Sequence, residues 1–133
     1  MRKIVARPIH RRSVSVLFAL IFALATAPGC SRSSSDTVPD ALLGVWTTPD
    51  HRYSGRFLEF RPHFVTFGLG EEGQAVYPVS SVEWTSESGQ SSFTVYYEGE
   101  DGSEYSVTLY RAPFDETLVF KNQLQTHWFR KRT

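Results

Sequence analysis

The sequence predicts an all-β domain, and two observations support that prediction. Aromatic and β-branched residues alternate with polar ones at period two, which is typical of strands with one buried and one solvent-exposed face. Turn-forming residues interrupt these runs at short intervals, and no segment of a dozen residues shows the helical period of 3.6. Eight or so short, hairpin-linked strands of this kind form either an antiparallel barrel or a two-layer sandwich.

The segments 56–61, 92–97 and 103–110 show the alternation most clearly. In 92–97, Phe93 shares one face with a valine and a tyrosine, and in 103–110 Tyr105 shares one face with a valine and a leucine. In 56–61 each face carries one phenylalanine. We therefore expect strands over all three segments, with aromatic side chains pointing into the core.

The N-terminal 30 residues have the layout of a secretory leader. Five basic residues precede an apolar run of 14 residues (14–27), and the small residues Ala27, Pro28 and Gly29 follow. The run is shorter than the roughly 20 residues that cross a bilayer as a helix. Cys30, the only cysteine of the chain, comes next.

A cysteine directly after these small residues resembles the bacterial lipoprotein signal. The resemblance implies that residues 1–29 are removed and that the thiol of Cys30 is acylated, for example with palmitate, to anchor the protein. Ser31 at the next position implies sorting to the outer membrane, facing the periplasm. Cleavage after residues 25–27 (Ala-Thr-Ala) is the alternative, and it would give a soluble secreted protein.

The leader also changes the charge balance. The whole chain has 14 basic and 14 acidic residues, and removing the five basic residues of the leader leaves nine basic ones, for a net charge of −5. Proteins that bind nucleic acids usually carry a basic excess that neutralises phosphates, so we set nucleic acid aside as a partner. A single cysteine also excludes an intramolecular disulfide.

The mature chain divides into two parts. Residues 30–40 are rich in serine, and within them 31–37 has no apolar side chain, so we expect a flexible tether there. Residues 41–133 form one domain of 93 residues with 17 aromatic side chains, which is long enough to fold alone.

The two ends of this domain carry a G-x-W motif, Gly44 and Trp46, and a basic residue in the last strand, Arg130. This pair resembles the calycin superfamily, which includes the lipocalins. The resemblance implies an up-and-down barrel of about eight strands in which Trp46 closes one end and Arg130, with Lys131 as the fallback, lies across its ring. A guanidinium over an aromatic face contributes about 0.5–2 kcal/mol.

An eight-stranded barrel has room for packed side chains or for one small ligand. We expect the open end to be rimmed by the loops 68–73 and 98–102, because binding residues are often carried on loops. An apolar ligand would meet inward aromatic residues, for which the candidates are Phe57, Phe93, Tyr105 and Phe120. The alternative is that these residues are plain core.

No catalytic or metal-binding motif is apparent. His51, His63 and His127 fall in three separate segments without metal-ligand spacing, and the acidic segment 98–104 lacks the alternating pattern of a calcium loop. No G-x-S-x-G motif marks a nucleophile. We therefore expect an envelope protein that is non-catalytic, has no cofactor and binds a small apolar ligand. The alternative is a module that binds or inhibits another protein of the envelope.

Overall fold

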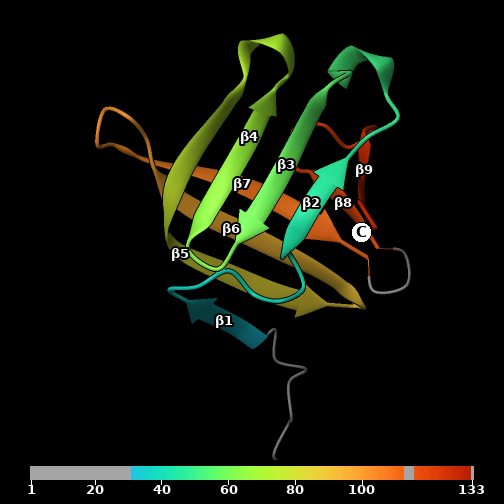
Figure 1. Ribbon diagram of the computed structural model, residues 1–133. Coiled ribbons are helices and arrows are strands. Elements are labelled where there is room, and N and C mark those ends of the chain that lie inside the picture. Colours follow the sequence, from blue (N-terminus) through green and yellow to red (C-terminus); the bar gives the residue numbers. More distant parts are fainter. Residues whose placement is uncertain (1–30, 113–115, 133) are drawn as a thin grey trace, which may run out of the picture.

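The computed structural model describes residues 31–112 and 116–132, which form a closed antiparallel barrel with one further strand on its outside (Figure 1). The elements are β1 (Ser31–Ser35), β2 (Gly44–Thr47), η1 (a 3-10 helix, His51–Tyr53), β3 (Arg56–Arg61), β4 (Phe64–Leu69), η2 (a 3-10 helix, Gly70–Glu72), β5 (Gln74–Glu87), β6 (Gln90–Glu98), β7 (Glu104–Arg111), β8 (Thr117–Phe120) and β9 (His127–Arg130). From β2 to β9 each strand pairs with the next, and β9 pairs with β2. The predicted all-β class and the up-and-down barrel are confirmed, and the architecture is consistent with a lipocalin-like fold.

The long strand β5 pairs with two neighbouring strands, one along each part of its length. Its first part, residues 74–78, pairs with β4, and residues 79–87 pair with β6. An irregularity between Val79 and Ser81 marks the change. Bulges of this kind bend a strand and increase its twist, which allows a sheet to close into a barrel.

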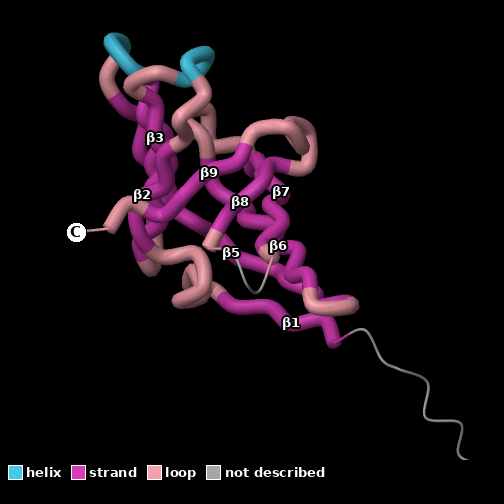
Figure 2. The backbone as a smooth tube through the Cα atoms, turned by 90° about the vertical axis from the view of Figure 1, so that its right-hand side faces the viewer, coloured by secondary structure: helices cyan, strands magenta, loops and turns pink. Residues whose placement is uncertain are grey.

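The second part of β5 extends past the end of β4, and β1 occupies the edge that β4 leaves free. Ser31 pairs with Ser86, and Arg32 forms an ion pair with Glu83. Figure 2 shows β1 alongside β5, at the end of the barrel away from both 3-10 helices.

This pairing corrects the expectation of a flexible tether over 31–37. Composition indicates which side chains can be buried, whereas β1 is held by backbone hydrogen bonds to an exposed strand edge. The chain also contributes to the core before residue 41, because Val38 is buried and its N–H donates to the carbonyl of Pro62 at 2.9 Å.

The barrel interior holds the core. Its buried apolar residues are Val38, Leu42, Trp46, Leu58, Phe60, Val65, Val82, Phe93, Val95, Leu109, Leu118 and Trp128. Within each strand these residues alternate with outward-facing ones, as period-two patterning predicts.

The two ends of the barrel differ. At the closed end, the segment 38–43 brings Val38 and Leu42 under the core. The open end carries the turns β2–β3, β4–β5, β6–β7 and β8–β9, and it includes both 3-10 helices. Within residues 31–112 and 116–132, no helix is long and apolar enough to cross a membrane.

Candidate functional site

Cys30 lies outside the described residues, and β1 begins at the residue that follows it.

Trp46 and Arg130 meet at the closed end. They are directly opposite in the β2–β9 register, and the guanidinium carbon of Arg130 lies 4.8 Å from the centre of the Trp46 ring. Arg130 Nη2 donates to the Ala41 carbonyl at 2.8 Å, and Trp46 Nε1 donates to the Leu42 carbonyl at 2.8 Å. These contacts connect β2, β9 and the segment before β2 at the closed end.

Gly44 and Lys131 complete this end of the barrel. Gly44 has a backbone φ of +115°, a conformation that residues other than glycine rarely adopt. Lys131 is exposed, and its backbone N–H donates to the Val45 carbonyl at 2.7 Å. The cation over the Trp46 ring is therefore that of Arg130 and not that of Lys131.

The four aromatic candidates for ligand contact lie in different surroundings. Phe120 lines a pocket at the open end, Tyr105 lies beside the β6–β7 turn, and Phe93 is 4% exposed within the core. Phe57 also lines the pocket at the open end, although its ring lies over Gly68 on the outer face of β3 and β4. The structure therefore brings Phe57 and Phe120 to one pocket, whereas Phe93 and Tyr105 lie elsewhere.

The ring of Phe57 does not point into the barrel, contrary to the expectation from the sequence. Strand β3 alternates so that Leu58 and Phe60 are buried, and Phe57 shares the opposite face with Glu59. The structure brings the ring of Phe57 against Gly68 because that glycine has no side chain; an added Cβ would lie 2.2 Å from Phe57 Cδ1.

A pocket of about 290 Å³, hereafter the open-end pocket, lies at the end of the barrel away from Trp46. Its apolar wall includes Tyr53, Leu58, Phe67, Val107, Phe120 and Trp128. Its polar lining residues include Arg56, Ser106, Asn122 and Gln123. A few polar groups in an apolar wall are typical of small-molecule sites, whose volumes begin near 300 Å³.

Trp128 gives this pocket its most specific chemical feature. The side chain is 4% exposed, and its Nε1 is buried without a hydrogen-bond partner among the described residues. Tyr53 and Phe120 hold the ring, with centroid distances of 5.7 and 5.6 Å. A buried N–H donor without an acceptor costs about 1–3 kcal/mol, so an acceptor placed here would be favourable.

The turn before β3 positions Tyr53. Asp50 caps η1: its carboxylate accepts a hydrogen bond from the backbone N–H of Arg52 at 3.0 Å. The carboxylate also accepts from the guanidinium of Arg52. The same hydrogen bonds lower the pKa of Asp50 to about 2. Asp50 therefore carries a negative charge at neutral pH and keeps η1, with Tyr53, in place.

The three histidines occupy separate elements: His51 is in η1, His63 is in the β3–β4 turn and His127 is in β9. In the part of the chain that the structure describes, no three metal-binding side chains gather in one place. The loops expected at the rim contribute separately, since Gly68 and Leu69 line the open-end pocket and residues 99–101 line a second pocket.

Sequence reasoning missed Trp128 and Tyr53. Trp128 lies two residues before Arg130, so the period-two rule that turns Arg130 inward also turns Trp128 inward. Tyr53 reaches the pocket from a 3-10 turn, and no strand pattern predicts its direction.

The chain matches no known protein-family model, and no significant match was found among curated proteins or among solved structures.

Proposed function

We propose that this protein is a non-catalytic, lipid-anchored barrel of the bacterial cell envelope that binds a small apolar molecule in the open-end pocket. The observation that carries the proposal is the unpartnered indole N–H of Trp128 in an apolar wall. Because this donor is buried behind the pocket wall, a small movement of the Trp128 ring on binding would bring it to a ligand's hydrogen-bond acceptor, and the ligand would bury its own apolar surface against Tyr53 and Phe120.

The volume of the pocket limits the size of the ligand. Water occupies about 30 Å³ per molecule in the liquid, so about ten waters would fill a pocket of this size. Phe60, Phe93 and Leu109 occupy the barrel interior beyond the pocket as buried core. The fitting class is therefore a compact apolar molecule with a carbonyl, hydroxyl or carboxylate group, and not a long acyl chain enclosed in the barrel.

The experiment that tests this proposal is a thermal-shift panel on the purified mature protein. Camphor, cyclohexanone and octanoate supply an acceptor, and hydrocarbons of matched size do not. A ligand at a hundredfold excess over its Kd stabilises the fold by about 2.7 kcal/mol, which raises Tm by roughly 10 °C or more in a domain of this size. If no compound raises Tm, ligand binding is rejected.

A pair of tryptophan variants makes the test specific. Trp128→Phe keeps the ring in the pocket and removes the N–H, so compounds with an acceptor should bind about 2- to 13-fold more weakly, given a net hydrogen bond of about 0.5–1.5 kcal/mol. Trp84→Phe is the matched control, because Trp84 packs on Phe93 away from the pocket. Equal losses in both variants would contradict a role for the Trp128 N–H.

The anchor in this proposal is an acyl group on Cys30, as the lipoprotein-like leader implies. Because β1 begins at Ser31 and pairs with β5 near the β5–β6 hairpin, an acylated Cys30 would hold the closed end against the bilayer. The open-end pocket would then face the aqueous phase. Intact-mass analysis should find an N-terminal acylated cysteine, whereas an unmodified N-terminus at Pro28 would reject the anchor.

Binding of another envelope protein is the second candidate, and a specific observation favours it. Phe64 and Val76 lie on the outer face of neighbouring strands and are 46% and 51% exposed. A photo-crosslinker at position 76 should capture a partner in membranes, and Phe64→Ser should abolish the adduct. If no adduct forms, this second candidate is rejected.

A further inference from the structure

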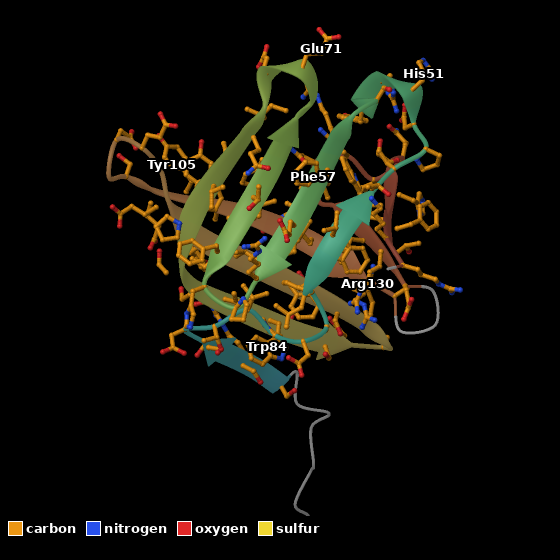
Figure 3. The ribbon with its side chains drawn as sticks, viewed as in Figure 1. His51, Phe57, Glu71, Trp84, Tyr105 and Arg130 are labelled. Carbon is orange, nitrogen blue, oxygen red and sulfur yellow. The ribbon has the colours of Figure 1, made fainter. Side chains whose placement is uncertain are left out.

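A second pocket, hereafter the tyrosine pocket, lies beside the β6–β7 turn and has a volume of about 300 Å³. Its lining residues are Tyr77, Tyr97, Gly99, Glu100, Asp101 and Tyr105. Three neighbouring strands, β5, β6 and β7, each supply one tyrosine. Figure 3 shows Tyr105 on the side of the barrel, well away from Arg130 and the closed end.

The three tyrosine rings form a ladder. Tyr77 and Tyr97 have centroids 5.4 Å apart, and Tyr97 and Tyr105 are stacked with centroids 6.0 Å apart. Phe67 supports the ladder from within the barrel, 5.5 Å from Tyr97. Tyr105 is 46% exposed, so the outer end of the ladder is accessible from solvent.

The backbone of the turn comes close to this outer ring. A Cβ added to Gly99 would lie 2.5 Å from Tyr105 Cε2, so the chain approaches the ring to a distance that only glycine allows. Tyr105 is also tied to the turn by its hydroxyl group, which donates to Asp101 Oδ2 at 2.9 Å. The ring therefore has a defined position although it is exposed.

The charge of the tyrosine pocket is negative. Asp101 accepts hydrogen bonds from the Ser103 backbone N–H at 3.1 Å and from Tyr105, and these bonds lower its pKa. The ion pairs found in residues 31–112 and 116–132 are Arg32–Glu83, Arg52–Asp50 and Arg61–Glu59. Neither Glu100 nor Asp101 has a basic side chain within ion-pair distance in that part of the chain.

We infer that the tyrosine pocket binds an organic ammonium group. Aromatic faces attract cations through their quadrupole, and aromatic cages are the usual sites for quaternary ammonium ligands. The unneutralised carboxylates of Glu100 and Asp101 add a favourable field at close range. An inorganic cation fits less well, because Ca²⁺ requires six to eight oxygen ligands. The described residues have no group of three acidic, histidine or cysteine side chains placed to hold a metal.

This inference does not rest on the proposed function. Tyr97 lines both pockets, but Asp101 and Tyr105 line only the tyrosine pocket, and Trp128 lines only the open-end pocket. Variants of Asp101 and Tyr105 should therefore leave binding in the open-end pocket unchanged, so the two proposals fail separately.

The test is a titration of the mature protein followed by NMR, with choline and n-butylammonium as probes for quaternary and primary ammonium groups. We expect saturable shifts of the Tyr97 and Tyr105 signals with at least one of the two. The control ligand is 3,3-dimethyl-1-butanol, which has the shape of choline without its charge. Equal affinity for this alcohol, no shift with either amine, or stronger competition by Ca²⁺ would overturn the inference.

Two variants locate the site. Tyr105→Leu removes one ring of the ladder at an exposed position, and Asp101→Asn removes the charge at nearly constant shape. Tyr105→Leu should weaken ammonium binding about two- to fivefold, the contribution of one cation–π contact at an exposed position, and Asp101→Asn should weaken it because one carboxylate charge is lost. Glu71→Gln, in the neighbouring β4–β5 turn, is the matched control and should bind as the wild type does. If the two variants bind ammonium as tightly as Glu71→Gln, the site is rejected; their Tm values report whether they are folded.

Discussion

Arg130 covers the indole ring of Trp46 from the opposite strand, with its guanidinium carbon 4.8 Å from the ring centre, and joins the last strand of the barrel to the first. The Trp46 ring is fully buried, and its N–H is bonded to the Leu42 carbonyl. The same two side chains thus pack across the β2–β9 pair that closes the barrel and cover its closed end.

The first prediction concerns the stability of this closure. Trp46→Ala should lower the free energy of unfolding by about 3–5 kcal/mol, because it empties a large buried volume. Arg130→Ala should cost less, and the double variant should cost less than the sum by about 0.5–2 kcal/mol, since the two side chains share a cation–π contact. Urea unfolding of the four proteins measures this coupling. Additive losses would contradict an energetic role for the contact.

The second prediction concerns Phe57 on the outer face. Gly68→Ala should destabilise the protein by about 1–3 kcal/mol, because the new methyl group overlaps the Phe57 ring that covers Gly68. In a Phe57→Ala background the same substitution should cost clearly less, as no ring has to move. Thermal unfolding of both pairs measures the difference. An equal cost in both backgrounds would mean that Phe57 does not cover Gly68.

Period-two patterning predicted the strands and most of their inward residues, and the calycin-like Gly44, Trp46 and Arg130 favoured a barrel over a two-layer sandwich. Phe93 and Tyr97 lie on one face of β6 as expected, because strict alternation leaves no other arrangement. Period-two patterning gave the wrong direction for Phe57, because both faces of that strand carry an aromatic residue. The polar neighbour Glu59 on the same face was the signal that Phe57 points outward.

Two other features of the fold, strand β1 and the open-end pocket, depend on contacts between distant residues, which the alternation of side chains along a strand does not predict. The serine-rich strand β1 forms because β5 has a free edge, and composition records side chains but not unpaired backbone groups. The open-end pocket depends on Tyr53, which a capped 3-10 turn brings against Trp128. Patterning predicts the direction of strand residues and not that of turn residues.

The third prediction concerns pH and the turn that carries Tyr53. The pKa of Asp50 is lowered to about 2 in the folded protein by its hydrogen bonds to Arg52, against about 3.9 in an unfolded chain. The stability it contributes is therefore present above about pH 4 and is lost as the pH falls towards 2. The gap in Tm between wild type and Asp50→Asn should shrink over that range.

Arg52→Gln is the matched variant, because it removes the guanidinium partner of Asp50 but keeps the backbone N–H bond, so it should weaken the pH dependence of Tm only in part. A gap in Tm that stays constant from pH 6 to pH 2 would contradict the assignment.

The fourth prediction concerns the orientation of the anchored protein. Since β1 joins the closed end, a fluorophore at Ser88→Cys in the β5–β6 hairpin should be quenched by a quencher in the lipid headgroups. The same fluorophore at Glu71→Cys in η2 should not be quenched, because η2 lies at the open end (Figure 3). In the proposed acylated form the thiol of Cys30 is blocked, so the new cysteine would be the only free thiol. Equal quenching at both positions would contradict this orientation.

Ligand binding in the open-end pocket is tested most directly by the indole N–H signal of Trp128 during a ligand titration, recorded by ¹⁵N-resolved NMR. The mature protein has three tryptophans, and Trp128→Phe and Trp84→Phe assign their signals. We predict that the tightest acceptor-bearing ligand of the panel shifts the Trp128 signal downfield, because its N–H gains a hydrogen bond. The Trp46 signal should stay in place, because that N–H already donates to Leu42. A bound ligand that leaves the Trp128 signal unchanged would contradict the role of this N–H in ligand binding.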